Sequence, residues 1–162
     1  MPSKVRPPRA VRPDGFSLIE LLIVVAVIGI LAAVSIPNLI ASRRAANEAS
    51  AISSVRTLST SEATYRSTYG DGMQFGDLAA LKSKTLVDDK LGAATSAASA
   101  KSGYVYSVVI TGGGEGFCAG AAPATATTGS RNFSSDEPGV IYVHAADYAN
   151  PPVTTSGGSP LN

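Results

Sequence analysis

Residues 16–36 read FSLIELLIVVAVIGILAAVSI, and this run decides what kind of fold the chain can have. It holds 21 residues, of which Glu20 alone is charged, and two, Ser17 and Ser35, are serines. A helix of about 20 apolar residues spans the hydrocarbon core of a bilayer. The run therefore predicts an N-terminal helix that crosses a membrane.

Charged residues flank the apolar run unevenly. No base follows the run until Arg43 and Arg44, whereas one acid, Asp14, and four bases stand before it: Lys4, Arg6, Arg9 and Arg12. Basic residues next to a membrane helix remain in the cytoplasm. We therefore expect a cytoplasmic N-terminus, with the rest of the chain on the other side of the membrane.

The remaining composition excludes several classes of protein. Residues 16–162 hold nine bases and eleven acids, so they lack the basic surface of a nucleic-acid-binding protein. The chain has one cysteine, Cys118, and cannot form an intrachain disulfide. Its one histidine, His144, lies far from Cys118 in the sequence, so a zinc site is not expected. No catalytic constellation is present, and we expect neither an enzyme nor a cofactor.

The apolar run has three interpretations. It could be a simple membrane anchor, or a secretory signal peptide cut near the small residues 33–35, although it is longer than the usual signal-peptide core. Neither explains Glu20, because a carboxylate in hydrocarbon is costly and normally has a partner. A cut between Gly15 and Phe16 would create an α-amine four residues from Glu20, on the same helix face. The third interpretation is thus a processed precursor.

Residues 15–33, GFSLIELLIVVAVIGILAA, closely resemble the processing motif of type IV prepilins and type II secretion pseudopilins, the class III signal peptides. The motif is a glycine, an aromatic residue, a glutamate five residues after the glycine, and an unbroken apolar helix. The resemblance implies that a prepilin peptidase cuts after Gly15 and N-methylates Phe16, and that Glu20 acts in assembly. Glycine would let the peptidase approach the backbone closely, because it has no Cβ.

The resemblance also implies an α+β, pilin-like fold, in which a small antiparallel β-sheet packs on the C-terminal half of a long N-terminal α-helix. We expect a cytoplasmic leader at 1–15, a transmembrane and filament-core helix at 16–37, and a head domain at 38–162. Gly29 and Pro37 are expected weak points of the helix, with a kink or a melted stretch at Pro37.

The function implied is that of a structural subunit of a type IV pilus. The expected partners are identical subunits in a helical filament, the prepilin peptidase, the inner-membrane assembly machinery and the membrane itself. The precursor would cross the inner membrane once, and the mature chain would belong to an extracellular filament. Whether that filament serves adhesion, motility or DNA uptake stays open.

Two alternative functions stay open. The first is a pseudopilin of a type II secretion system, which is disfavoured because the sequence has no tryptophan and lacks the Pro-x-Asp-Pro-Trp-Gly segment usual in its major subunit. The second is a periplasmic domain on a membrane anchor.

Residues 38–69 predict a continuation of the helix, which the glycines and aspartate of 70–72 would end. Apolar residues recur there every three or four positions and predict one buried stripe. Its expected members are Ala45, Ala49, Ile52, Val55, Leu58, Tyr65 and Tyr69; the opposite, polar face carries Arg43, Arg44, Glu48, Arg56 and Arg66.

The head reads as three short strands after an irregular region. Asp77 is a candidate cap for a short helix at 78–83, and 93–102 is a small-residue stretch expected to form a surface loop. Alternating residues predict strands at 104–110, 117–121 and 140–143, with a glycine-rich turn at 112–116 between the first two.

The other polar groups of the head have structural interpretations. Glycines 112–116 lack the Lys-Ser/Thr of a phosphate loop. Two acidic pairs, Asp88 with Asp89 and Asp136 with Glu137, could bind calcium but are more typical of solvated loops. Residues 134–139 read as a turn, and the tail, 151–162, is expected over the surface or against a neighbouring subunit. Many pilins close a C-terminal loop with two cysteines, so here packing or neighbouring subunits must hold it; the role of Cys118 stays open.

Overall fold

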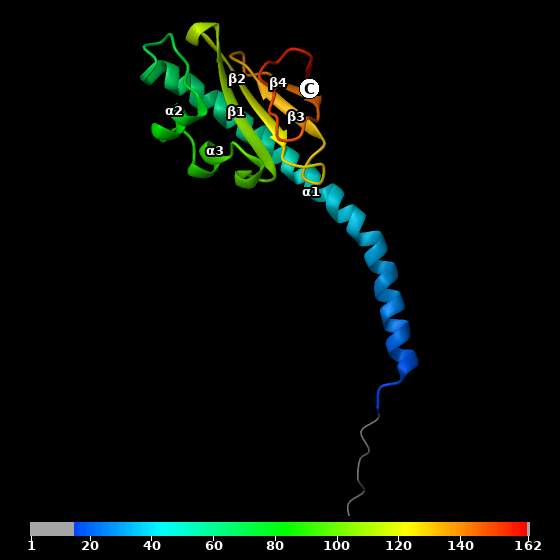
Figure 1. The fold of residues 1–162 in the computed structure, drawn as a ribbon. Helices are drawn as coiled ribbons and strands as arrows, with labels where there is room; N and C mark the ends of the chain where they lie inside the picture. Colours follow the sequence, from blue (N-terminus) through cyan, green and yellow to red (C-terminus); the bar gives the residue numbers. More distant parts are fainter. Residues whose placement is uncertain (1–14, 162) are drawn as a thin grey trace, which may run out of the picture. The chain divides into compact units, whose positions relative to one another are not determined.

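The computed structural model describes residues 15–161, which divide into two compact units between Asn38 and Leu39. The leader expected at 1–15 lies outside the described residues, apart from Gly15. Helix α1, Leu18–Thr68, contributes to both units (Figure 1). It ends in a turn where Asp71 and Gly72 adopt φ angles of 51° and 75°, and where the Gly72 amide donates to the Arg66 carbonyl at 2.9 Å. The predicted stop at 70–72 is therefore confirmed.

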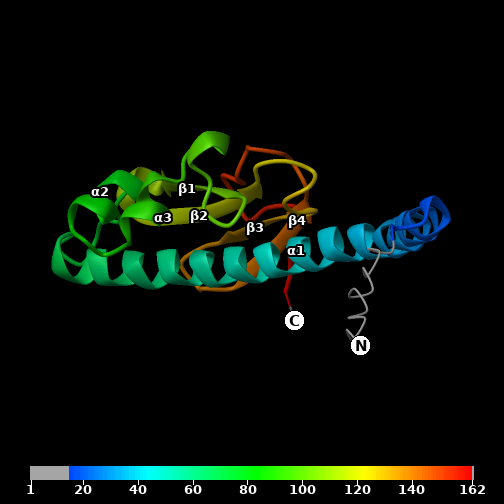
Figure 2. The same cartoon turned by 90° about the horizontal axis from the view of Figure 1, so that it is seen from below.

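The second unit contains a five-stranded antiparallel sheet that lies against the C-terminal half of α1 (Figures 1 and 2). The strands are adjacent in chain order: β1 Tyr104–Thr111, β2 Gly116–Pro123, β3 Arg131–Ser135, β4 Ile141–Ala145 and β5 Ser159–Pro160. This arrangement confirms the expected α+β, pilin-like fold. Short helices α2 (Leu78–Ser83) and α3 (Asp89–Ala93) and single turns η1 (Ala97–Ser99) and η2 (Gly112–Gly114) complete the unit.

The core lies between the sheet and α1. Val55 and Leu58 of the helix are fully buried, and both belong to one cluster with Tyr104, Phe117 and Phe133 of the sheet. Alternate residues of each strand point to opposite faces, so every second side chain of β1 to β3 reaches this core. The apolar stripe of α1 thus supplies one wall of the domain interior.

The buried stripe of α1 differs from the predicted one. Ala45 and Ala49 are exposed, and Tyr69 is 45% exposed. Glu48, expected on the solvent face, is instead buried, as is Glu62. The helix face toward the sheet follows the spacing Glu48, Ala51, Val55, Leu58, Glu62, and it includes carboxylates because loops after the helix supply their hydrogen-bond donors.

Three of the strands were expected and two were not. Strands β1, β2 and β4 confirm the alternating patterns, and η2 confirms the glycine turn. Strand β3 was missed, so the prediction that 134–139 is a turn is wrong at Ser134 and Ser135, which pair with Tyr142 and Ile141. Its sequence, RNFSS, is polar, but burial on both faces of the sheet removes the usual alternation.

The region before the strands, which was expected to be irregular, is partly helical. Asp77 caps α2 as predicted, accepting from the Ala80 amide at 2.7 Å. Helix α3 was not expected; Asp88 caps it by accepting from the Leu91 amide at 2.5 Å. The surface-loop prediction for 93–102 is wrong at Ala94, which is fully buried and whose carbonyl accepts from the Tyr106 amide at 2.7 Å.

Residues 146–158, here called the C-terminal strap, fold back onto the second face of the sheet. Buried Asn132 fastens the strap: its amide nitrogen donates to the carbonyls of Asp147 (3.4 Å) and Asn150 (3.2 Å), and its oxygen accepts from the Asp147 amide (3.2 Å). A Cβ at Gly120 would lie 2.3 Å from the Pro152 oxygen, so the strap approaches β2 too closely for any other residue. Hydrogen bonds and close packing therefore hold the C-terminal region. The chain has one cysteine and cannot close this region with an intrachain disulfide.

Candidate functional site

The bond expected to be cut, between Gly15 and Phe16, lies in a non-helical segment directly before α1. Phe16 is 74% exposed, and a Cβ built on Gly15 would meet no atom of the described residues within 4 Å. The chain's own packing therefore does not require a glycine at this position. An exposed, extended bond with space around it has the form that a protease needs in a substrate.

Glu20 lies in the first turn of α1 and is exposed. Its Oε2 accepts a hydrogen bond from the backbone amide of Ser17 at 3.3 Å. A carboxylate three residues after the capping position satisfies an unpaired amide and stabilises the positive end of the helix. The structure thus brings Glu20 to the backbone next to Phe16, while its pairing with a new α-amine stays a prediction.

The apolar side chains of the first unit are exposed around the helix. Leu18 is 80% exposed, Ile30 67% and Val34 63%, and the large apolar residues between them behave alike. Soluble monomers rarely expose a contiguous apolar surface of more than a few hundred Å². α1 is long and apolar enough to cross a membrane. This surface therefore requires lipid or other apolar helices as its surroundings.

Gly29 and Pro37 both lie inside α1, and neither ends it. No helix-breaking gap occurs at Pro37, and the bend expected there stays a prediction. The side-chain amide of Asn38 donates to the Val34 carbonyl at 3.2 Å, one turn earlier. This bond adds a donor to the turn that loses one backbone hydrogen bond to proline.

Glu48 fastens the C-terminal half of α1 to the start of β3. Its Oε1 accepts from the Ser130 amide (3.0 Å) and hydroxyl (2.8 Å), and its Oε2 accepts from Arg131 Nε (3.0 Å) and Nη2 (2.6 Å). Burial alone would raise the pKa of Glu48, but these hydrogen bonds and the Arg131 charge outweigh it and lower the pKa below its usual value. Sequence reasoning missed this contact because its partners are more than 80 residues away.

Glu62 is the second buried carboxylate of α1 and is fully inaccessible. Its Oε2 accepts from the Gly76 amide at 3.0 Å, but its Oε1 has no hydrogen-bond partner among the described residues. Burial raises the pKa of Glu62 to about 7; the Gly76 bond opposes the rise, and the charge of Asp77 adds to it. Glu62 is therefore partly protonated near neutral pH.

The acidic pairs of the head have structural partners. Asp88 caps α3 and pairs with Lys101 at 3.1 Å, and Asp89 lies 3.7 Å from Lys82. Asp136 accepts from Thr155 of the strap at 3.1 Å, and Glu137 pairs with Arg66. These contacts fit the interpretation as loop acids. Within residues 15–161 no group of three potential metal ligands comes together.

Cys118 and His144 lie on the strap side of the sheet. Cys118 is buried, with its Sγ 3.8 Å from the Pro152 carbonyl, and burial, with a smaller effect from Asp136, raises the pKa of its thiol to about 11. His144 Nε2 lies 2.7 Å from the Ser134 hydroxyl, and burial lowers the pKa of its imidazole. Both therefore serve as packed residues under the strap.

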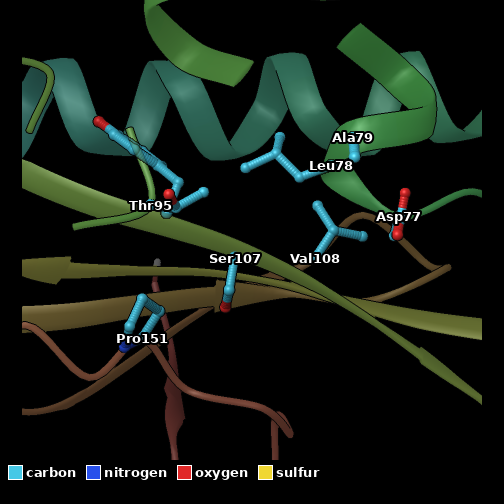
Figure 3. A pocket seen from close by; sticks show the side chains of 8 residues that line it. Asp77, Leu78, Ala79, Thr95, Ser107, Val108 and Pro151 are labelled. Carbon is cyan, nitrogen blue, oxygen red and sulfur yellow. The ribbon is translucent and has the colours of Figure 1, made fainter. Parts of the chain in front are cut away.

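A pocket of about 250 Å³ opens between α2 and β1 (Figure 3). Leu78, Val108 and Pro151 supply apolar walls, and the carboxylate at its edge, Asp77, is already occupied as the cap of α2. Ligand sites usually exceed about 300 Å³ and bring several polar groups together. This pocket does neither.

A long helix with an exposed apolar N-terminal part, followed by a small antiparallel sheet, defines a pilin-like protein. Comparison with known proteins agrees. Residues 12–36 match the prokaryotic N-terminal methylation motif. The chain is 71% identical over 34 residues to the type IV wide pilus major component PilA4 of Thermus thermophilus. This match covers 21% of this chain and 26% of that protein.

A second relative is the type IV major pilin protein PilA of Myxococcus xanthus, 45% identical over 54 residues, or 33% of this chain and 24% of that protein. The matches thus span about a quarter of the length of each relative. No solved structure matches the chain significantly. The N-terminal segment of this chain is thus similar to those of these type IV pilus proteins and matches the methylation motif.

Proposed function

We propose that this chain is a structural subunit of a type IV pilus. It is made as a precursor that crosses the inner membrane once, is cleaved after Gly15, is N-methylated at Phe16 and polymerises through α1 into an extracellular filament. The observation that carries the proposal is the exposed apolar surface of α1, which follows directly on an accessible Gly15–Phe16 bond. The named relatives, both pilus proteins, support it.

The apolar surface serves both states of the subunit. Lipid surrounds it in the membrane, and the same surface of neighbouring subunits surrounds it in the filament core. The transfer from lipid to core is nearly neutral in hydrophobic terms, so packing and polar contacts must favour the filament. Cleavage provides one such contact, because it replaces the Phe16 amide by an α-amine three bonds from the Ser17 amide nitrogen that Glu20 now binds.

In this mechanism Glu20 exchanges partners. In the precursor it stabilises the start of its own helix through Ser17. In the filament it accepts the Phe16 amine of a neighbouring subunit, and this pairing sets the register between helices. The partners implied are identical subunits, a prepilin peptidase and the assembly machinery of the inner membrane; no catalytic step belongs to this chain.

The intact mass of the mature chain tests the proposal. After expression with a prepilin peptidase, we expect loss of residues 1–15 and gain of one methyl group. A mature start at Ile36 would mean an ordinary signal peptide, and an uncut chain would mean a plain anchor. Gly15→Val is the matched control: no atom of residues 15–161 fills the space at Gly15, so the substitution should block the peptidase and leave the fold unchanged.

Electron microscopy of filaments sheared from the cell surface then separates a pilus from a secretion pseudopilus. Abundant surface filaments that contain this chain support the pilus. Processed chain that stays in the cell envelope, with secretion lost when the gene is deleted, would support the pseudopilin.

A further inference from the structure

We infer that Arg43 and Arg44 bind the phosphates of lipid headgroups on the non-cytoplasmic face of the membrane, and that they set the depth of the stored precursor so that Glu20 lies at the cytoplasmic edge of the hydrocarbon. The inference rests on the proposed membrane-inserted precursor. It concerns charges that the fold itself leaves without partners.

The spacing of charges along α1 is the first argument. The 22 residues 21–42 carry no charge and stand between Glu20 and Arg43. A bilayer core of about 30 Å holds about 20 helical residues. A helix placed with 21–42 across the core therefore has a charge at each interface and none inside. The polar residues of this stretch, Ser35, Asn38 and Ser42, all fall in its second half, toward the headgroups.

Two depths of the helix compete, and they differ by five residues. If the hydrocarbon began at Phe16, Glu20 would lie inside it and the arginines would extend into water. If it begins at Leu21, residues 38–42 enter the hydrocarbon in place of residues 16–20, so Leu39 and Ile40 replace Leu18 and Ile19, and the burial of Phe16 is given up. The second depth removes the carboxylate from the hydrocarbon and places two guanidinium groups among phosphates, so both charge terms favour it.

The head does not neutralise these arginines. Neither Arg43 nor Arg44 forms an ion pair with any residue of the described range 15–161, and Arg44 Nε is buried without a hydrogen-bond partner there. The acid best placed on the helix is Glu48, four residues after Arg44, where an ion pair normally forms. Both oxygens of Glu48 are instead occupied by Ser130 and Arg131. Among the described residues the fold thus gives Arg44 no carboxylate, and its terminal Nη groups, unlike the buried Nε, remain for an external anion.

Guanidinium groups suit phosphate because they are planar, permanently charged and donate two parallel hydrogen bonds. The resulting depth also serves processing. With the hydrocarbon beginning at Leu21, the Gly15–Phe16 bond lies outside it, since the first three residues of α1, which rise about 1.5 Å each, and the non-helical residues 16 and 17 stand between them. The two arginines therefore act as a stop that presents the junction on the cytoplasmic side.

Depth-dependent fluorescence quenching tests the inference. The full-length chain, with Cys118→Ala and a fluorophore on Ser17→Cys, is placed in vesicles of phosphatidylcholine and phosphatidylglycerol with brominated acyl chains. We expect weak quenching in this background. R43Q with R44Q should increase it, as residue 17 moves toward the bilayer centre by up to roughly 7 Å, the rise of five helical residues. R43K with R44K should behave as the background, because the charges remain.

The matched control is Arg56→Gln, which removes an exposed arginine of α1 that lies well beyond the apolar run and has no ion pair within 15–161; it should not change quenching. Equal quenching in R43Q/R44Q and the background overturns the inference. If that variant keeps its depth but no longer forms filaments in cells, the arginines contact another copy of the chain instead. A chain that fails to float with the vesicles contradicts the membrane-stored precursor itself.

Discussion

The two parts of α1 differ in which side chains they expose and which they bury, although they belong to one helix. In residues 18–38 the large apolar side chains are exposed and the single charge, Glu20, bonds only to its own helix start. In residues 48–62 the apolar face is covered by the sheet, and the two glutamates at its ends, Glu48 and Glu62, are buried with it. Among the described residues, the apolar side chains of the first part have no covering partner, whereas even two carboxylates of the second part accept hydrogen bonds inside the head.

This contrast separates assembly from folding. Residues that we propose to act between molecules are conspicuous in the first part because the other described residues leave them uncovered. Residues that hold the head together are hidden in the second part because distant loops complete them. Substitutions in the first part should therefore change filament formation without unfolding the head, and substitutions in the second part should do the reverse.

The largest expected effect is that of Glu20→Ala on filament yield. Removing one partner of a buried ion pair costs about 3–5 kcal/mol, which is on the order of a hundredfold or more in an association constant. The variant should still be inserted and cleaved, because the Gly15–Phe16 bond does not depend on the carboxylate. The measurement is the amount of sheared filament relative to cleaved chain in the membrane. Abundant normal filaments from this variant would contradict the proposed assembly role of Glu20.

Glu62→Gln should remove a pH dependence from the stability of the head. The pKa of Glu62 is raised from 4.5 to about 7, so its contribution to stability is complete below pH 4.5 and is lost as the pH rises to 7. The loss is on the order of 3 kcal/mol. Glutamine keeps an oxygen for the Gly76 amide and has no charge, so the variant should be the more stable protein at pH 8.

Urea unfolding of the detergent-solubilised full chain at pH 5 and pH 8 measures this difference. Glu115→Gln is a matched control, because Glu115 is exposed and should change little at either pH. A Glu62→Gln variant that is less stable than the parent at pH 8 would contradict the assignment.

Arg131→Ala should destabilise the head by about 2 kcal/mol, since it leaves the buried Glu48 carboxylate with Ser130 alone. The cost is below that of a fully buried pair because the Arg131 side chain is 47% exposed. The pKa of Glu48 is lowered in the folded chain, so this stabilisation is present above pH 4.5 and is lost as the pH falls through the folded value. Unfolding at pH 7 and pH 4 should therefore show a smaller difference between variant and parent at pH 4.

The smallest effect is expected for Asn132→Ala, which releases the strap from β3. Three hydrogen bonds are lost and buried strap groups are left unpaired, for a cost of about 1–3 kcal/mol. Limited proteolysis should cut within residues 146–158 faster than in the parent, while α1 and the strands β1 and β2 stay intact. Unchanged cleavage would mean that packing at Gly120 holds the strap without Asn132.

The sequence correctly predicted the elements that depend on interactions between residues close together in the chain. The apolar run, the Asp77 cap, the glycine stop after α1 and the alternating residues of β1 each act over a few positions, and the structure has them where expected. The likeness to pilins in the first 40 residues agrees with the matched methylation motif and with the similar pilus protein.

Elements completed by distant residues escaped prediction. Strand β3 is polar because its second face meets the strap, and β5 has two residues and no pattern of its own. Glu48 looked like a solvent-facing charge because Ser130 and Arg131 are more than 80 positions away. The same reason applies to the proposed assembly role of Glu20: its proposed partner belongs to another molecule, so the single chain does not contain the contact.

The strap has a consequence for where and how the subunit matures. Asn132 and the close approach at Gly120 hold the C-terminal region with hydrogen bonds and packing, and Cys118 is buried beneath them as a thiol. Closing this region needs no oxidant and no disulfide-forming enzyme. The head can therefore reach its final form under reducing conditions, and its stability does not depend on the redox state of the compartment that the filament crosses.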